Sequence, residues 1–247
     1  MPTKPLLLLT AALAAILALL NAPTAQAKPL PRETVIIVPG QSFGAIPYSF
    51  LKQGFETAGY RVEVLNTPGL NLPADAHVIA RAVDAAHAIS GPGARVSLVG
   101  HSVGGMSARY YLKFLGGAPK VATYVAIGTS QYGNPSACQQ SGTARDVCLG
   151  SPLLSRLNKG VNAVGPTSYY SIRSAKEWAD GRITGKQCRL IVPSLTGNGG
   201  LDHTLEPFDP NVLNTTLAAL AGRCTGTSAN EPADSIVASR TLFPAGR

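Results

Sequence analysis

The chain has 247 residues, of which 45% are hydrophobic and 14% charged, a composition that suits one globular domain and excludes a disordered or fibrous protein. Its formal net charge is +8, but lysine and arginine are scattered singly, without the basic clusters that line a nucleic-acid groove. We therefore expect a solvated basic surface, no nucleic-acid partner and at most weak attraction to anionic interfaces.

The first 27 residues are typical of a secretory signal peptide. Lys4 supplies a positive charge, residues 6–20 are almost wholly apolar, and the AQA segment at 25–27 is a small-residue cleavage site. An uncleaved membrane anchor is the alternative, but the apolar run is shorter than the ~20 residues that a spanning helix needs. We expect a secreted protein, extracellular or periplasmic, whose mature part begins at Lys28.

Short β-branched segments alternate with helical patterns over residues 28–224, which form the expected catalytic domain. This alternation predicts an α/β fold with a mostly parallel sheet of about six strands and helices on both faces. The expected strands are 34–38, 61–65, 95–99, 121–127, 167–172 and 188–193. The expected helices are 46–59, 74–90, one from 102 or 103 to 116, 151–161 and 210–222. Residues 225–247, rich in small residues and proline, are expected to be a loosely held tail.

A serine stands among glycines at residues 100–105. The segment GHSVG at 100–104 fits the pattern G-x-S-x-G, follows an expected strand and opens an expected helix. In such an elbow the nucleophile is held in a strained conformation, and only glycine at 100 and 104 lets the strand and the helix approach it. Ser102 is therefore the expected nucleophile. A phosphate-binding turn is disfavoured, because neither G-x-x-x-x-G-K-[ST] nor G-x-G-x-x-G is present.

The general base is expected after Ser102, because the triad of such an elbow follows the chain order serine, acid, histidine. Of the four histidines only His203 does so. His77 and His87 lie on an expected helix and are interpreted as surface residues, and His101 as a packed residue of the elbow. His203 lies in a glycine-rich loop after the last expected strand, and such a loop can carry a base to the carboxyl edge of the sheet.

Four carboxylates are candidates for the acid that orients the base. They are Asp146, Glu177, Asp180 and Asp202. Asp146 precedes the strand whose end should carry the acid, and Asp202 is adjacent to His203 in the sequence, which is an awkward geometry. Glu177 is favoured because it is nearer the strand end and has the longer side chain, and Asp180 is the alternative.

The oxyanion of the reaction needs two backbone N–H donors, one from the residue after the nucleophile and one from the loop after the first strand. Val103 supplies the first. Gln41 is expected to supply the second, with its side-chain amide as a further donor, because Pro39 has no N–H and Gly40 allows a close approach.

Four cysteines, an even number in an exported chain, predict two disulfides. Of the three pairings we favour Cys138–Cys148, which flanks one short polar loop, and Cys188–Cys224, which joins an expected strand to the end of the last helix. A metal site is disfavoured, because the chain has no short Cys-x-x-Cys spacing.

The GHSVGG elbow, the VPGQ loop at 38–41 and the DHTLEPFDP segment at 202–210 resemble those of secreted bacterial and fungal lipases of the α/β-hydrolase fold. SIRSAKEW at 171–178 is similar to the family's Ser-Ile-x-Ser-x-x-Asp stretch, with Glu177 where the aspartate is usual. The similarity extends over roughly residues 33–224. It implies a serine ester hydrolase that acts on triacylglycerols or simpler carboxylic esters.

This chemistry requires no metal and no cofactor. A structural calcium ion near Asp202 or Asp209 is an additional hypothesis. The expected partners are an ester or lipid substrate and a transient lipid–water interface, and the expected state is a monomer. An acyltransferase or polyester depolymerase would use the same acyl-enzyme, whereas an inactive lipid-binding scaffold would not need the complete set of residues found here. Activity is expected to rise between about pH 6 and 8, because the histidine base must be neutral.

Overall fold

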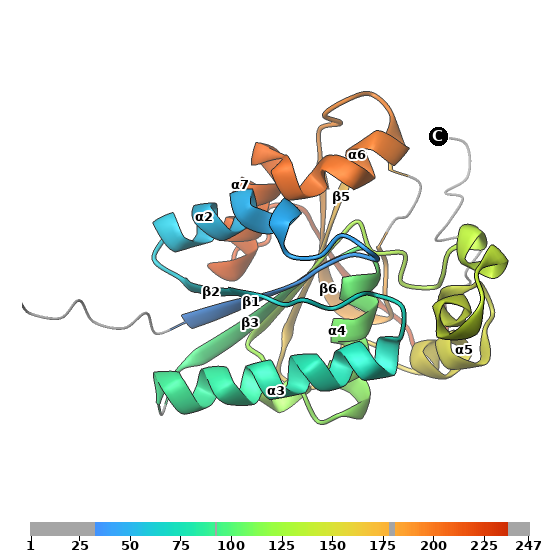
Figure 1. Cartoon of the computed structure of the whole chain (residues 1–247), viewed down its shortest axis with the longest axis horizontal. Helices are drawn as coiled ribbons and strands as arrows, with labels where there is room; N and C mark the ends of the chain where they lie inside the picture. Colours follow the sequence, from blue (N-terminus) through green and yellow to red (C-terminus); the bar gives the residue numbers. More distant parts are fainter. Residues whose placement is uncertain (1–32, 92, 178–180, 237–247) are drawn as a thin grey trace, which may run out of the picture. The chain divides into compact units, whose positions relative to one another are not determined.

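In the part of the chain that the structure describes, seven strands form a single sheet in the order β2-β1-β3-β4-β5-β6-β7 (Figure 1). They are β1 Glu33–Val38, β2 Arg61–Val64, β3 Arg95–His101, β4 Thr123–Ile127, β5 Ser168–Ser174, β6 Gly185–Val192 and β7 Thr227–Glu231. The first six pair in parallel, and β7 pairs antiparallel with β6. The chain leaves β1 toward one edge of the sheet and returns through β3 toward the other. The carboxyl ends of β1 and β3 therefore lie at the switch point where ligands bind in open α/β sheets.

The computed structural model describes residues 33–91, 93–177 and 181–236. The expected signal peptide, residues 1–27, and the end of the expected tail lie outside these residues. No helix in the described part is both long and apolar enough to cross a lipid bilayer.

Helices cover both faces of the sheet (Figure 1). The α-helices are α2 Ser49–Thr57, α3 Leu72–Ser90, α4 Val103–Phe114, α5 Pro152–Asn158, α6 Gly199–Leu205 and α7 Pro210–Leu220. Short 3-10 helices are η1 Ile46–Tyr48, η2 Ala118–Lys120, η3 Pro135–Gln139, η4 Gly142–Val147 and η5 Glu206–Phe208. Helices α3 and α4 pack on one face, and α2 and α7 on the other.

The alternation of residues along β1 shows how this three-layer core forms. Ile36 and Val38 belong to the core on the side of α3 and α4, whereas Val35 and Ile37 belong to the core on the side of α2 and α7. All four side chains are completely buried. Because both faces of a parallel sheet are covered, its strands read as continuous apolar runs, which is why the first six could be predicted.

The seventh strand corrects the expectation that a loose tail begins at residue 225. Thr227–Glu231 pairs with β6, with Ser228 opposite Cys188, and the Cys188–Cys224 disulfide holds the chain just before it. Within the described residues the sheet therefore has seven strands, one more than the six that the sequence marked. The sequence TSANE carries no apolar alternation, since an edge strand can be held by backbone hydrogen bonds alone, and so it gave no strand signal.

Candidate active site

Ser102 lies in the sharp turn between β3 and α4, and its backbone has the left-handed φ of 54° that side chains rarely adopt. A Cβ on Gly100 would lie 2.5 Å from the Cα of Gly105, and a Cβ on Gly104 would overlap the backbone oxygen of Val38. The strand and the helix therefore approach each other only because these positions are glycines. The side chain of Ser102 is half-buried at the carboxyl edge of the sheet.

His203 and Glu177 complete a chain of contacts that begins at Ser102. The Oγ of Ser102 lies 3.1 Å from Nε2 of His203, and Nδ1 of His203 lies 2.6 Å from Oε1 of Glu177. The side chain of Glu177 is fully buried after the end of β5, whereas that of His203 is 22% exposed. With Nδ1–H donating to the carboxylate, Nε2 is left free to accept the serine proton.

The other acid candidates lie elsewhere. Asp180 lies outside the described residues. Asp146 is on η4, where its backbone oxygen accepts a hydrogen bond from Ser151. Asp202 points away from the imidazole, as its place next to His203 predicted.

The carboxylate of Asp202 instead anchors α6, the helix that carries His203. It accepts hydrogen bonds from the hydroxyls of Ser174, Ser194 and Thr196 and from the Thr196 N–H. Burial opposes its ionisation, but these hydrogen bonds outweigh burial and lower the pKa of Asp202 to about 2. The expected glycine-rich loop is therefore corrected to a short helix held at the ends of β5 and β6.

Gln41 and Val103, the expected oxyanion donors, lie side by side. A Cβ on Gly69 would lie 2.7 Å from both the Cα of Gln41 and Cγ1 of Val103. Neither backbone N–H has an acceptor among the described residues. The side-chain amide of Gln41 pairs with that of Gln140 through two hydrogen bonds, of 2.9 and 3.2 Å, so it is already occupied.

His101 is more than a packed residue of the elbow. The hydroxyl of Tyr48 accepts a 2.7 Å hydrogen bond from the Gly40 N–H and lies 2.7 Å from Nδ1 of His101, while Nε2 of His101 lies 3.0 Å from the backbone oxygen of His203. Burial raises the pKa of the Tyr48 hydroxyl and lowers that of His101 to about 3. The tyrosine therefore donates to a neutral imidazole, which donates to His203. Tyr48 was missed because no sequence motif marks it.

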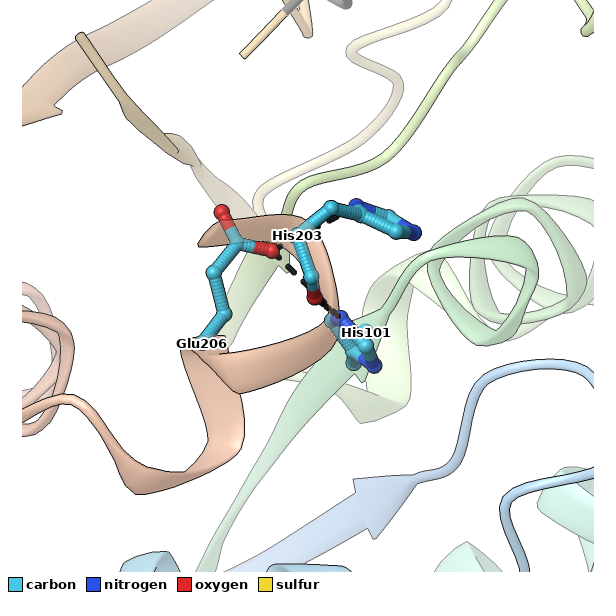
Figure 2. Close-up of side chains that lie close together, drawn as sticks. All are labelled: His101, His203 and Glu206. Carbon is cyan, nitrogen blue, oxygen red and sulfur yellow. Dashed lines mark hydrogen bonds and ion pairs between the residues drawn. The ribbon is translucent and has the colours of Figure 1, made fainter. Parts of the chain in front are cut away.

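Figure 2 shows His101 and His203 together with a second buried glutamate, Glu206 of η5. One nitrogen or oxygen atom of each residue lies within 4.8 Å of the others, a spacing compatible with a metal. Both ring nitrogens of His101 are already engaged in the hydrogen bonds to Tyr48 and to the His203 backbone. We therefore assign the cluster to the hydrogen-bond network around His203. Both oxygens of the Asp202 carboxylate accept hydrogen bonds, and Oδ1 of Asp209 accepts one from the Asn211 N–H.

The disulfides have the favoured pairing, Cys138–Cys148 and Cys188–Cys224. The first closes the η3–η4 segment, which carries Gln140 against Gln41. The second joins β6 to the chain that follows α7.

Solved lipases and esterases share this architecture. Lipase B of Aspergillus fumigatus is 17% identical, with a TM-score of 0.63 over 90% of this chain and 60% of that chain. A Bacillus licheniformis lipase in its propeptide form is 14% identical, with a TM-score of 0.58 over 87% of this chain and 55% of that chain. A metagenomic carboxyl esterase is 18% identical, with a TM-score of 0.50 over 62% of this chain and 53% of that chain.

The chain spans between about half and three fifths of the length of these three neighbours. The sequence matches no protein-family model, and it has no significant match among curated proteins. What the likeness shows is the fold: the chain has the α/β-hydrolase fold.

Proposed function

We propose that the chain is a secreted serine carboxylic ester hydrolase, a triacylglycerol lipase or carboxylesterase, that works through an acyl-enzyme. The observation that carries this proposal is the contact chain of Ser102, His203 and Glu177 at a strained strand-to-helix turn, with distances of 3.1 and 2.6 Å. The α/β-hydrolase fold adds support by analogy alone, since one fold hosts many activities.

In the proposed reaction the Oγ of Ser102 attacks the ester carbonyl carbon while Nε2 of His203 takes the hydroxyl proton. The Glu177 carboxylate stabilises the imidazolium through Nδ1–H. The unpaired N–H groups of Gln41 and Val103 stabilise the oxyanion, which then expels the alcohol as Nε2 returns the proton to it. Water attacks the acyl-enzyme by the same route and releases the acid.

Several exposed apolar side chains favour an ester with an apolar acyl group. Leu70 adjoins Gly69 beside Gln41 and is 41% exposed, and Leu201 lies two residues before His203 and is 55% exposed. Ile46, in the segment after Gln41, is 87% exposed. Two disulfides fit the oxidising environment of an exported protein.

Ser102→Ala tests the proposal. The variant is expected to lower kcat/KM for p-nitrophenyl esters by about 10⁴-fold or more, because no other group supplies the nucleophile. A serine-directed phosphonate should label the wild-type protein once, at Ser102, as mass spectrometry of the peptides would show. Ser107→Ala is the matched control, because Ser107 lies on α4, is fully buried, and its hydroxyl has no hydrogen-bond partner among the residues that the structure describes.

Retained turnover in Ser102→Ala would contradict the proposed nucleophile. Wild-type protein that neither hydrolyses esters nor reacts with the phosphonate would support an inactive scaffold. Rates on short-chain esters, emulsified oil and polyester film separate esterase, lipase and depolymerase, and acyl transfer to an added alcohol would reveal an acyltransferase.

A further inference from the structure

Glu206 is a second buried carboxyl group beside His203. Its side chain is 2% exposed, and its Oε2 lies 3.6 Å from Nδ1 of His203 and 3.4 Å from Nε2 of His101 (Figure 2). Glu206 forms a side-chain hydrogen bond with Glu177 and a further hydrogen bond with the Ser174 backbone. Two buried carboxyl groups thus meet beside one imidazole, an arrangement that is costly when both groups are ionised.

Gly128, which follows β4, leaves the space in which these groups meet. A Cβ there would overlap Oε2 of Glu206 and would lie 2.8 Å from Nδ1 of His203 and 3.0 Å from Oε1 of Glu177. The two carboxyl groups therefore converge on the same ring nitrogen from two elements, the end of β5 and η5. Glu177 lies 1.0 Å closer to Nδ1, since the distances are 2.6 and 3.6 Å.

Glu206 ionises less readily than an ordinary glutamate. Burial and the neighbouring Glu177 carboxylate raise the pKa of Glu206 well above its usual range. The titratable groups that face Glu206 are Glu177, Asp202, His101, His203 and Tyr48. Neither His101 nor Tyr48 is charged, so neither provides a positive charge that would favour ionisation of Glu206.

We propose that Glu206 is a reserve acid for His203: a positioning residue that is neutral beside the Glu177 carboxylate and takes over its role when that carboxylate is removed. The inference rests on the proposed ester-hydrolase function. Without the Glu177 charge, Glu206 releases its proton to solvent, and the resulting carboxylate accepts from Nδ1–H after a shift of about 1 Å to hydrogen-bond distance. It then stabilises the imidazolium that forms when Nε2 takes the Ser102 proton.

Four proteins test this: the wild type, Glu177→Ala, Glu206→Gln and the double variant, each assayed for kcat/KM on one p-nitrophenyl ester. Alanine is used at 177 because a glutamine amide there would donate to Nδ1 and block Glu206. We expect Glu177→Ala to lose about 10- to 100-fold and the double variant about 10³- to 10⁴-fold, the loss typical of a triad without any acid. Glu206→Gln alone should lose at most about one order of magnitude.

The pH profile separates a reserve acid from a structural role. The ratio of the Glu177→Ala rate to the double-variant rate should rise with pH as Glu206 ionises, because only the Glu177→Ala variant retains that carboxyl group. A ratio that does not change with pH, or a Glu177→Ala variant as inactive as the double variant, overturns the inference. So does a Glu206→Gln variant that loses as much as Glu177→Ala.

Urea unfolding adds a readout that does not depend on activity. A carboxyl whose pKa is raised in the folded state contributes stability at low pH that is lost as pH rises. Glu206→Gln, which needs no proton to stay neutral, should therefore have a higher urea midpoint than the wild type at pH 7, and the difference should vanish toward pH 4. No gain at pH 7 contradicts a protonated Glu206.

Glu56→Gln, at an exposed glutamate on α2, is the matched control and should change neither rate nor midpoint. The two proposals fail in different ways. If the ester-hydrolase proposal is wrong, Ser102→Ala keeps the activity of the wild type. If only this inference is wrong, the wild type is active and Ser102→Ala is not, but Glu177→Ala is as inactive as the double variant.

Discussion

The Tyr48 hydroxyl joins the proposed oxyanion loop to the elbow and, through His101, to α6, the helix that carries His203. It satisfies the buried Gly40 N–H and the buried Nδ1 of His101, each at 2.7 Å. An unsatisfied buried polar group costs about 1–3 kcal/mol. Tyr48→Phe should therefore lower the free energy of unfolding by about 2–4 kcal/mol. It should also lower kcat more than it changes KM, because Gln41 and His203 lose their common support.

Tyr170→Phe is the control for this prediction. Tyr170 is buried on β5, and its hydroxyl makes no hydrogen bond within the part of the chain that the structure describes. Urea unfolding and steady-state kinetics at one temperature compare the two variants. Equal effects of the two substitutions would show that the hydroxyl of Tyr48 has no part in holding the site.

At the scale of the element, α6 is a short helix whose position depends on one carboxylate. Because the pKa of Asp202 is lowered in the folded state to about 2, its contribution is present at pH above the ordinary aspartate value and is lost as pH falls through the folded value. Asp202→Asn should lower the free energy of unfolding by about 3 kcal/mol at pH 7. This difference should shrink between about pH 4 and pH 2.

Asp84→Asn is the control for the pH dependence. Asp84 pairs with Lys120 at 2.7 Å, but its side chain is 58% exposed, so the pair is expected to contribute less than about 1 kcal/mol. Chemical denaturation at a series of pH values measures both variants. A deficit of Asp202→Asn that stays the same down to pH 2 would contradict ionisation as the source of the anchor.

Helix α6 also shows why some elements could not be predicted. The glycines in SLTGNGG predicted a loop, yet Asn198 caps the helix by accepting from the Gly200 and Leu201 N–H groups, and Asp202 ties it to the sheet. These contacts are tertiary. The first six strands and five helices were predictable because their buried residues give a recognisable pattern of apolar residues in the sequence. A short polar element has no such pattern.

The candidate site divides in the same way. Ser102, Glu177 and His203 follow strands or carry a local pattern, so chain order and residue type were enough to propose them, with Asp180 as the alternative to Glu177. Tyr48 and Glu206 belong to no motif, and each also contacts His101, which lies on a strand far from both in the sequence. Asp180, the alternative acid, lies outside the described residues, so the choice of Glu177 remains a prediction that the Glu177→Ala variant tests.

At the scale of the molecule, four segments distant in the sequence meet at the carboxyl edge of one sheet. Gln41 follows β1, Ser102 follows β3, Glu177 follows β5, and His203 comes after β6. A parallel sheet brings such ends together whatever the length of chain between them. The geometry of the site therefore depends on the sheet as a whole. A disulfide far from the site should affect mainly stability, whereas a disulfide next to a site residue should also affect activity.

The two disulfides provide that comparison. Cys188–Cys224 closes a separation of 36 residues and Cys138–Cys148 one of 10, so loop-closure entropy predicts losses of about 4 and about 3 kcal/mol when each is replaced by an alanine pair. Only the shorter loop carries Gln140 against Gln41. Its removal should therefore lower kcat on a short ester by about 3- to 10-fold under conditions where both variants stay folded, since a misplaced oxyanion donor weakens transition-state binding. The variant without Cys188–Cys224 should thus lose more stability, and the variant without Cys138–Cys148 should lose more activity. Urea unfolding and steady-state kinetics on both variants measure the two losses. The prediction is contradicted if one variant shows both larger losses.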